Sequence, residues 1–266
     1  MSCITPYVIL ASVQHEIDYV ATPQETLLDL LERTKRSSVP VRRVLLQLPG
    51  PPKCPGPFAA FVSGRRALAL DLYLLLHAGA ASAPWDVRQP AMSWARMLEL
   101  PQTAGAESTI SRNWTWLERQ KLARSERDHR IRKMYLLMED GSGREFTRPT
   151  GGERGFFKLP YAYFHQRWHR ELKLPGKATL LLCLAQAPTF TLPTEHASGW
   201  YGVSADTLQR GLDELRDLGL LKTWTRAKKA PRTRFGFTMV NHYALQGPFV
   251  RAPIESSAKP FTGSVT

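Results

Sequence analysis

Two stretches of the chain carry the same spacing of apolar and polar residues. In residues 109–123 and 207–221, apolar side chains recur after four and then three positions. That spacing places them on one face of an α-helix and leaves the other face polar. The apolar positions are Ile110, Trp114 and Leu117 in the first stretch, and Leu208, Leu212 and Leu215 in the second. The pattern predicts one amphipathic helix that occurs twice.

Each predicted helix has a serine placed to cap its N-terminus. Ser108 precedes the first helix and Ser204 precedes the second. A serine hydroxyl at this position accepts a backbone N–H that has no partner inside the helix. Gly219 ends the second helix, because glycine favours the helix C-terminus.

The segments around the two helices repeat as well. An apolar helix and a short helix that begins near a proline precede each one, and two β-like runs follow. The first copy comprises 65–78, 90–100, 109–123, 122–126 and 131–138, and the second comprises 176–187, 193–202, 207–221, 221–225 and 234–240. This is the element order of a winged helix-turn-helix domain, whose third helix enters the DNA major groove.

Proline- and glycine-rich stretches mark the expected boundaries. Residues 48–57 hold too many prolines for a helix or a central strand, and 141–155 have the composition of a flexible linker. We expect a mainly α protein with small β wings, built from two tandem winged helix-turn-helix domains and an N-terminal extension. The N-terminal extension covers 1–62 and domain 1 covers 63–140. The linker covers 141–155, domain 2 covers 156–245 and the tail covers 246–266.

The second copy also resembles a known class of proteins. Residues 204–221 resemble many bacterial winged-helix regulators in their spacing of Ser, Thr, Arg, Leu and Gly. Residues 155–185 are similar to the lead-in of tandem winged-helix proteins carried by actinobacterial plasmids, phages and chromosomes. The first copy departs from this pattern, since Gln120-Lys121 replaces Leu218-Gly219. The resemblance implies DNA binding, in transcription regulation or in plasmid replication initiation.

Composition favours a folded intracellular protein with a polyanionic partner. The 266 residues include 36 Lys and Arg against 23 Asp and Glu, a formal net charge of +13. Such a charge points to nucleic acid or to an anionic membrane surface. Three widely separated cysteines fit a reducing cytosol better than a disulfide framework. The longest apolar run is too short to span a bilayer, so we expect a cytoplasmic, nucleoid-associated protein without membrane contact.

The polar face of the second helix supplies candidates for reading DNA bases. The candidates at its N-terminal end are Ser204, Thr207, Gln209 and Arg210. Arginine pairs with guanine and glutamine pairs with adenine through bidentate hydrogen bonds. In the alternative interpretation, Arg210 forms a surface ion pair with Asp206 or Glu214, each four residues away.

The C-terminal half of the second helix is acidic and is expected to lie outside the groove. Asp213, Glu214 and Asp217 would repel phosphate there. Gly211 in mid-helix costs about 1 kcal/mol relative to alanine. Close approach of another helix, or of DNA, would explain it.

The first helix carries an equivalent polar set. The candidates are Ser111, Arg112, Asn113 and Thr115. Trp114 and Trp116 are two residues apart and therefore lie on different faces. Trp116 is a candidate for stacking or protein contact, with plain packing as the alternative.

A basic hairpin is expected after each of the two helices. The second has no acidic residue, and its charge would be neutralised by phosphates if it lay along a DNA backbone. Its candidates are Arg226, Lys228, Lys229, Arg232 and Arg234, and those of the first hairpin are Arg130 and Arg132. A merely solvated hairpin is the alternative, more so in the first, where Glu126 and Asp128 dilute the basic charge.

The chain contains no complete motif for catalysis or metal binding. Gly176-Lys177 lacks the upstream glycine and the following hydroxyl residue of a P-loop. His165 and His169 are four residues apart, but no further ligand is placed to complete a site, and we expect both on a solvent-facing stripe. We expect no enzymatic activity, no metal and no cofactor.

Three roles stay open at this point. The first is a sequence-specific double-stranded DNA-binding transcriptional regulator, and the second is a plasmid or mobile-element replication initiator that binds origin repeats. The third is a scaffold that uses winged-helix folds for protein contacts. Residues 22–34 form either a homodimer contact or a brace within the chain.

Overall fold

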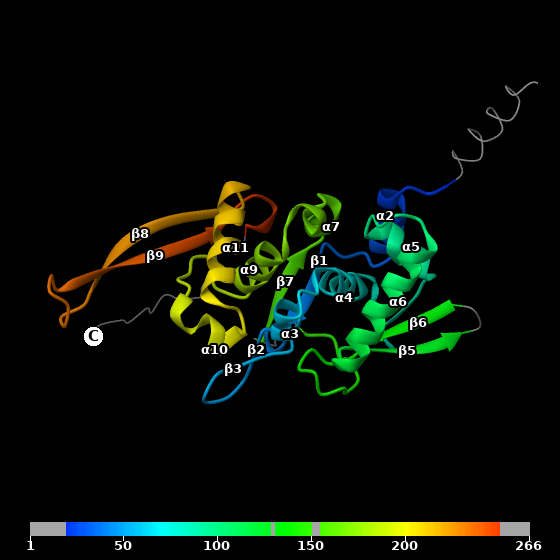
Figure 1. The fold of residues 1–266 in the computed structure, drawn as a ribbon, viewed down its shortest axis with the longest axis horizontal. Coiled ribbons are helices and arrows are strands. Elements are labelled where there is room, and N and C mark those ends of the chain that lie inside the picture. Colours follow the sequence, from blue (N-terminus) through cyan, green and yellow to red (C-terminus); the bar gives the residue numbers. More distant parts are fainter. Residues whose placement is uncertain (1–19, 129–130, 151–154, 251–266) are drawn as a thin grey trace, which may run out of the picture.

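The structure, a computed structural model, describes residues 20–128, 131–150 and 155–250 (Figure 1). It is mixed α/β, 44% helical and 22% strand, with small sheets. The strand content exceeds that of two wings because three further strand pairings occur among the described residues. The expectation of a mainly α protein is therefore corrected to a mixed fold.

From residue 58 onward, one short helix and three longer helices precede a hairpin (Figure 1). Its elements are α3 (Phe58–Ser63), α4 (Ala67–Gly79), β4 (Asp86–Arg88), α5 (Ala91–Met97), α6 (Ala104–Arg119), β5 (Ala123–Asp128) and β6 (Ile131–Leu136). The three strands form one antiparallel sheet in the order β4-β6-β5. The predicted helices and strands of the first copy are present, with β4 added between α4 and α5.

The second half repeats this order behind a strand and two short helices. Its elements are β7 (Phe156–Pro160), α7 (Ala162–His165), α8 (Trp168–Glu171), α9 (Leu174–Leu184), η2 (Thr194–His196), α10 (Ala197–Tyr201), α11 (Ala205–Asp217), β8 (Leu221–Lys229), β9 (Phe237–Leu245) and η3 (Gly247–Phe249). A single antiparallel bridge between Phe190 and Tyr243 takes the place that β4 has in the first half. In Figure 1 the two hairpins, β5–β6 and β8–β9, lie at opposite ends of the molecule.

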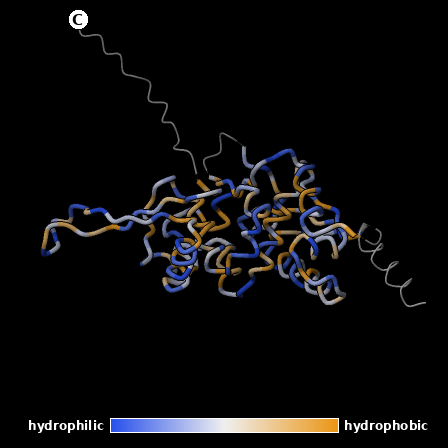
Figure 2. Tube along the Cα trace, turned by 90° about the horizontal axis from the view of Figure 1, so that it is seen from above, coloured by the Kyte–Doolittle hydropathy of each residue, from blue (hydrophilic) through white to orange (hydrophobic). Residues whose placement is uncertain are grey.

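The two apolar helices α4 and α9 are buried on all sides. Ten consecutive residues of α4 and nine of α9 have little or no exposed surface, as their nearly continuous apolar sequences predict. In Figure 2 the apolar residues concentrate in the interior of the trace. Among the described residues, neither of these helices nor any other is long and apolar enough to cross a membrane.

The two predicted helix caps have different outcomes. The Ser204 hydroxyl accepts the backbone N–H of Thr207 at 3.1 Å, so this cap is confirmed. Ser108 is not a cap, because α6 begins at Ala104 and Ser108 lies inside it. The helix extends upstream because Ala106 packs into the core, which outweighs the low helix propensity of Gly105.

An N-terminal helix, α2 (Pro23–Glu32), packs against the first half of the chain. Thr22 forms a capping box: its hydroxyl accepts the N–H of Glu25 at 3.2 Å, and the Glu25 carboxylate accepts the N–H of Thr22 at 2.8 Å. Leu27, Leu30 and Leu31 are buried, and α2 contacts α4, α5 and α7. The apolar face of α2 is thus filled within the chain, which favours the brace over the homodimer contact.

A short sheet joins the N-terminal region to the second half of the chain. β1 (Ser38–Arg42) pairs antiparallel with β7, with Val39 opposite Leu159 and Val41 opposite Phe157. These four side chains are buried. β1 continues through η1 (Arg43–Leu45) to the small pair β2 (Gln47–Leu48) and β3 (Cys54–Pro55). The β1–β7 pairing therefore connects the N-terminal region to the second half of the chain.

The expected linker is anchored to the fold within residues 141–150, although most of these residues are exposed. Phe146 is buried and lies edge-on to the rings of His77 and Trp85. The Arg42 guanidinium donates to the carbonyl oxygen of Thr147 at 2.5 Å and to the Glu139 carboxylate at 3.1 Å. Glu139 is fully buried, so the ion pair fixes β1 beside this segment.

Candidate nucleic-acid interface

α11 is held against α9 by an unusually close backbone contact. A Cβ atom on Gly211 would lie 2.0 Å from the Thr179 hydroxyl oxygen and 2.4 Å from the carbonyl oxygen of Pro175. No side chain fits at these distances, so glycine is required. Close approach of another helix, one of the two explanations offered by the sequence, is therefore found, and it fixes which face of α11 points outward.

The outward face of α11 carries the predicted base-reading residues Gln209 and Arg210. Each is paired with an acidic side chain of the same helix. Arg210 forms an ion pair with Asp206 at 2.7 Å, and both side chains are more than half exposed. Gln209 donates to the Asp213 carboxylate at 3.0 Å. Exposed pairs of this kind contribute about 0–1 kcal/mol, so a base edge or a phosphate can replace them at little cost.

Ser204 and Thr207 serve the start of the helix. The Ser204 hydroxyl donates to the Thr207 hydroxyl at 2.9 Å while it accepts the Thr207 N–H. Thr207 is half-buried and Ser204 is exposed. Backbone N–H groups at this end carry partial positive charge, which favours an anion such as phosphate.

One acidic residue of α11 has a structural role that the sequence did not reveal. The Glu214 carboxylate accepts the N–H of Lys173 at 2.7 Å and the N–H of Gly176 at 3.1 Å. It therefore caps the N-terminus of α9 from a neighbouring helix. This contact turns Glu214 toward α9, and no local pattern signals it because the cap comes from a residue distant in the chain.

β8 and β9 form an arm whose two faces differ in character. Side chains two positions apart on a strand share a face, so Lys222, Arg226 and Lys228 of β8 lie in one row with Trp224. The Trp224 ring stacks on His242, with ring centroids 5.8 Å apart, and the Arg226 guanidinium lies 5.9 Å from the Trp224 ring. The arm stands clear of the rest of the trace in Figure 2.

The arm concentrates cations without any compensating acid. Residues 218–250 contain no Asp or Glu. The basic residues of this stretch are all exposed: Lys222, Arg226, Lys228, Lys229, Arg232 and Arg234. Such a row of like charges repels itself, and a polyanion relieves the repulsion.

The predicted residues of α6 divide into an outward and an inward group. Ser111 and Arg112 are exposed, and the Arg112 guanidinium donates to the Thr109 hydroxyl at 3.1 Å. Asn113 is buried, and its amide donates to the carbonyl oxygen of Thr109 at 2.8 Å. The Thr115 hydroxyl, half-buried, donates to the carbonyl oxygen of Ser111 at 3.1 Å. Only Ser111 and Arg112 point away from the core.

The tryptophans of α6 pack inside the molecule. Trp114 lies edge-on to Trp94, with ring centroids 5.2 Å apart, as expected for a core residue. Trp116 lies edge-on to Phe61 at 4.8 Å and is only partly exposed. Plain packing, the alternative considered for Trp116, therefore describes it.

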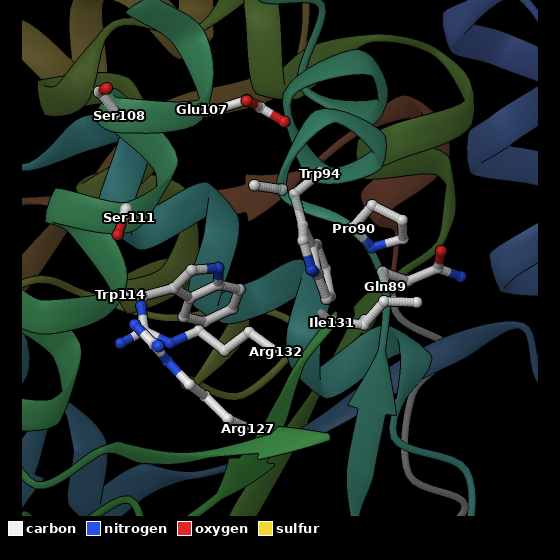
Figure 3. A pocket seen from close by; sticks show the side chains of 11 residues that line it. Gln89, Pro90, Trp94, Glu107, Ser108, Ser111, Trp114, Arg127, Ile131 and Arg132 are labelled. Atoms are coloured by element: carbon white, nitrogen blue, oxygen red, sulfur yellow. The ribbon is translucent and has the colours of Figure 1, made fainter. Parts of the chain in front are cut away.

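A hollow of about 690 Å³ separates α6 from the β5–β6 hairpin (Figure 3). Ser111 and Trp114 border it on one side, and Arg127 and Arg132 extend into it from the strands. Arg127 and Arg132 are direct cross-strand partners, an arrangement of like charges that is unfavourable without an anion. Glu118 lies 3.7 Å from Arg132 and offsets one charge in part. Arg130 lies outside the described residues.

His165 and His169 do not share a helical face. Arg167 adopts a left-handed backbone (φ 60°) and separates α7 from α8. His169 is buried, with a pKa lowered to about 4 by desolvation and by Lys177. The expectation of a solvent-facing stripe is therefore wrong for His169, because it assumed one continuous helix.

Comparison of the chain with known protein families, with characterised proteins and with solved structures finds no match.

Proposed function

We propose that the protein binds double-stranded DNA through two tandem winged helix-turn-helix units. In the first unit α4, α5 and α6 are followed by the β5–β6 wing, and in the second α9, α10 and α11 are followed by the β8–β9 wing. Both orders agree with the expected motif, and β4 and the Phe190–Tyr243 bridge occupy matching places. The proposal makes α6 and α11 the recognition helices.

The observation that carries the proposal is the continuity of α11 with the arm. α11 ends at Asp217 and β8 begins at Leu221, so only three residues link the helix to the basic arm. The N-terminal half of α11 would enter the major groove. The row of Lys222, Arg226 and Lys228 would follow the phosphate backbone.

Arg210 is the residue that would carry sequence preference in the second unit. It would leave Asp206 for a guanine edge, which offers two acceptors in the major groove. The inward placement of Glu214 supports this arrangement, since the carboxylate is occupied at α9. Asp217 at the end of α11 would stay outside the groove.

The first unit would contact a second DNA half-site, whose base sequence would differ from the one that the second unit reads. Ser111 and Arg112 would face the groove, and Arg127 with Arg132 would receive a phosphate in the hollow beside α6. The two outward sets differ, Ser111-Arg112 in one unit and Gln209-Arg210 in the other. A single chain would therefore prefer a non-palindromic site.

Transcription regulation is the role that we favour for this binding. A replication initiator would use the same interface on repeated sites, and a protein scaffold would not need it. Selection from a pool of random duplexes with the full chain, at physiological salt concentration, tests the proposal. Enrichment of one non-palindromic sequence is expected, whereas recovery of no duplex above background would overturn DNA binding and favour the scaffold.

A further inference from the structure

The outer end of the arm exposes a cluster of large apolar side chains. Phe235 is 74% exposed, Phe237 is 48% exposed and Met239 is 58% exposed. Other exposed large apolar residues of the described chain are scattered, at Val20, Leu218 and Val250. A cluster of this kind marks a contact surface, because apolar side chains that stay exposed to water add nothing to the stability of the fold.

The strand register separates this cluster from the basic row. Phe237 lies opposite Lys229 and Met239 lies opposite Ala227, on the face that buries Leu221 and Leu245 at the base of the arm. The basic row of Lys222, Arg226 and Lys228 lies on the other face. The arm thus has one basic face and one face that becomes apolar and exposed toward its tip.

The turn at the tip is closed by hydrogen bonds. The Ala230 N–H donates to the carbonyl oxygen of Gly236 at 2.8 Å, and the Thr233 hydroxyl lies 2.8 and 3.0 Å from the carbonyl oxygens of Ala230 and Phe237, either of which accepts its proton. Gly236 has a positive φ of 73°, which glycine adopts without strain. Phe235 is therefore presented by an ordered turn, with the Arg234 guanidinium 5.5 Å from its ring.

We propose that the tip enters the DNA minor groove and inserts Phe235 as a wedge between neighbouring base pairs, bending the duplex. This inference rests on the proposed DNA binding and deepens it. Insertion of an apolar side chain unstacks one base step and kinks the DNA, which lets more of the protein contact the backbone.

Charge and reach argue for DNA as the occupant of this surface. Lys229 lies opposite Phe237, the Arg234 guanidinium lies beside the Phe235 ring, and the arm has no acidic residue, so a polyanion with an apolar interior fits this surface. A base stack inside two phosphate backbones has that character. Nine residues per strand give the arm a length of about 30 Å, which exceeds the half turn of about 17 Å that separates a major groove from the next minor groove. The arm is therefore long enough for its tip to reach the minor groove beside the major groove that α11 would read.

The test uses the full chain and the duplex recovered by selection. A fluorescent adenine analogue is placed at successive positions of that duplex, and a donor–acceptor pair at its ends reports bending. We expect the wild-type chain to raise the analogue's fluorescence at one step beside the major-groove contact and to shorten the end-to-end distance. Phe235→Ala should lose both signals while the salt dependence of binding stays the same, and Phe235→Leu should keep part of both.

Each remaining outcome overturns the inference in a recognisable way. If Phe235→Ala binds and bends the duplex as the wild type does, with the same fluorescence pattern, there is no wedge although DNA binding stands. If the wild type binds no duplex, the proposed function fails with it. If Phe235 instead controls binding to vesicles containing anionic phosphatidylglycerol, with no change on DNA, the tip is a membrane contact. Phe235 is exposed, so unfolding by urea should be equal in all variants.

Discussion

Asp71 in α4 and Lys177 in α9 form a buried ion pair that joins the first helices of the two units. The Tyr163 hydroxyl donates to the other Asp71 carboxylate oxygen at 2.7 Å. Desolvation raises the pKa of Asp71, and the nearby Lys177 opposes that rise. The pair therefore fixes how the two units sit together, and with them the two proposed recognition helices.

Removal of one partner of this pair should destabilise the whole protein. Lys177→Met leaves a buried carboxylate without its cation, which typically costs about 3–5 kcal/mol. The double variant Asp71→Leu with Lys177→Met should recover most of that loss, because it leaves no unpaired charge. Urea unfolding of the three proteins measures both effects, and equal stability of Lys177→Met and wild type would contradict the burial of the pair.

Gly211→Ala should loosen the second unit although alanine is the better helix former. The new methyl group would collide with Thr179 and with the backbone of Pro175, and overpacking of this kind costs about 1–3 kcal/mol. Gly199→Ala in α10 is the matched control, because nothing lies within 4 Å of its Cβ position. It should stabilise by about 0.5–1 kcal/mol. Thermal unfolding in which both variants change in the same direction would contradict the close helix contact.

Arg210→Ala should lower affinity for the selected duplex by about 1–3 kcal/mol and relax the preference at one base pair. Asp206→Ala is the control, since it frees Arg210 from its surface partner and should keep or raise affinity. Fluorescence anisotropy on the selected duplex and on single-base variants gives both quantities. Uniform weakening on all duplexes would make Arg210 a phosphate contact, and no change would leave it in the ion pair.

Stability should fall as the pH falls below about 6.5. Burial, together with Arg36 and Arg42, lowers the pKa of His77 to about 3, while the pKa of His169 is about 4. Between these values and about 6.5, the unfolded chain binds protons that the folded chain does not. Each histidine then lowers the free energy of unfolding by about 1.4 kcal/mol per pH unit, and above pH 7 neither contributes a slope.

The variant His77→Gln distinguishes the contribution of His77 from that of His169. Glutamine does not titrate in this range, so the loss of stability between pH 6 and 4.5 should become about half as steep. Asp71 acts in the opposite sense, because its raised pKa lets the folded chain take up a proton first. Urea unfolding at several pH values provides the slopes, and an unchanged slope in His77→Gln would show that His77 titrates normally.

Local signals were sufficient for the elements that carry the proposed interface. The apolar spacing of Leu208, Leu212 and Leu215 lies within α11, and the structure places the Ser204 cap and the left-handed Gly219 directly beside its two ends, as predicted. The same reasoning misplaced the start of α6 at Ser108, because an alanine-rich turn extends a helix without a polar–apolar alternation to reveal it. The sequence reasoning also included Asn113 among the candidates for DNA contact. Asn113 is buried, and its burial depends on where the helix packs.

Contacts between distant segments could not be predicted from the chain. The pairing of β1 with β7, the cap that Glu214 gives to α9 and the Asp71–Lys177 pair each join residues many positions apart. Each is decided by tertiary packing, and a single sequence carries no signal for it. The two-faced character of the arm also required the strand register, since a shift of one residue would exchange its faces.

The dependence of DNA affinity on salt concentration tests the proposed interface most directly. The triple variant Lys228→Ala, Lys229→Ala, Arg232→Ala removes three cations from the arm, and each lost phosphate contact lowers the log–log salt slope by about 0.9. A control triple, Lys35→Ala, Arg65→Ala, Lys158→Ala, removes the same charge from exposed positions outside the arm. We expect the arm variant to bind all duplexes more weakly with a slope reduced by up to about 2.7, and the control to keep the wild-type slope. An unchanged slope in the arm variant, or an equal reduction in both, would exclude the arm from the DNA interface.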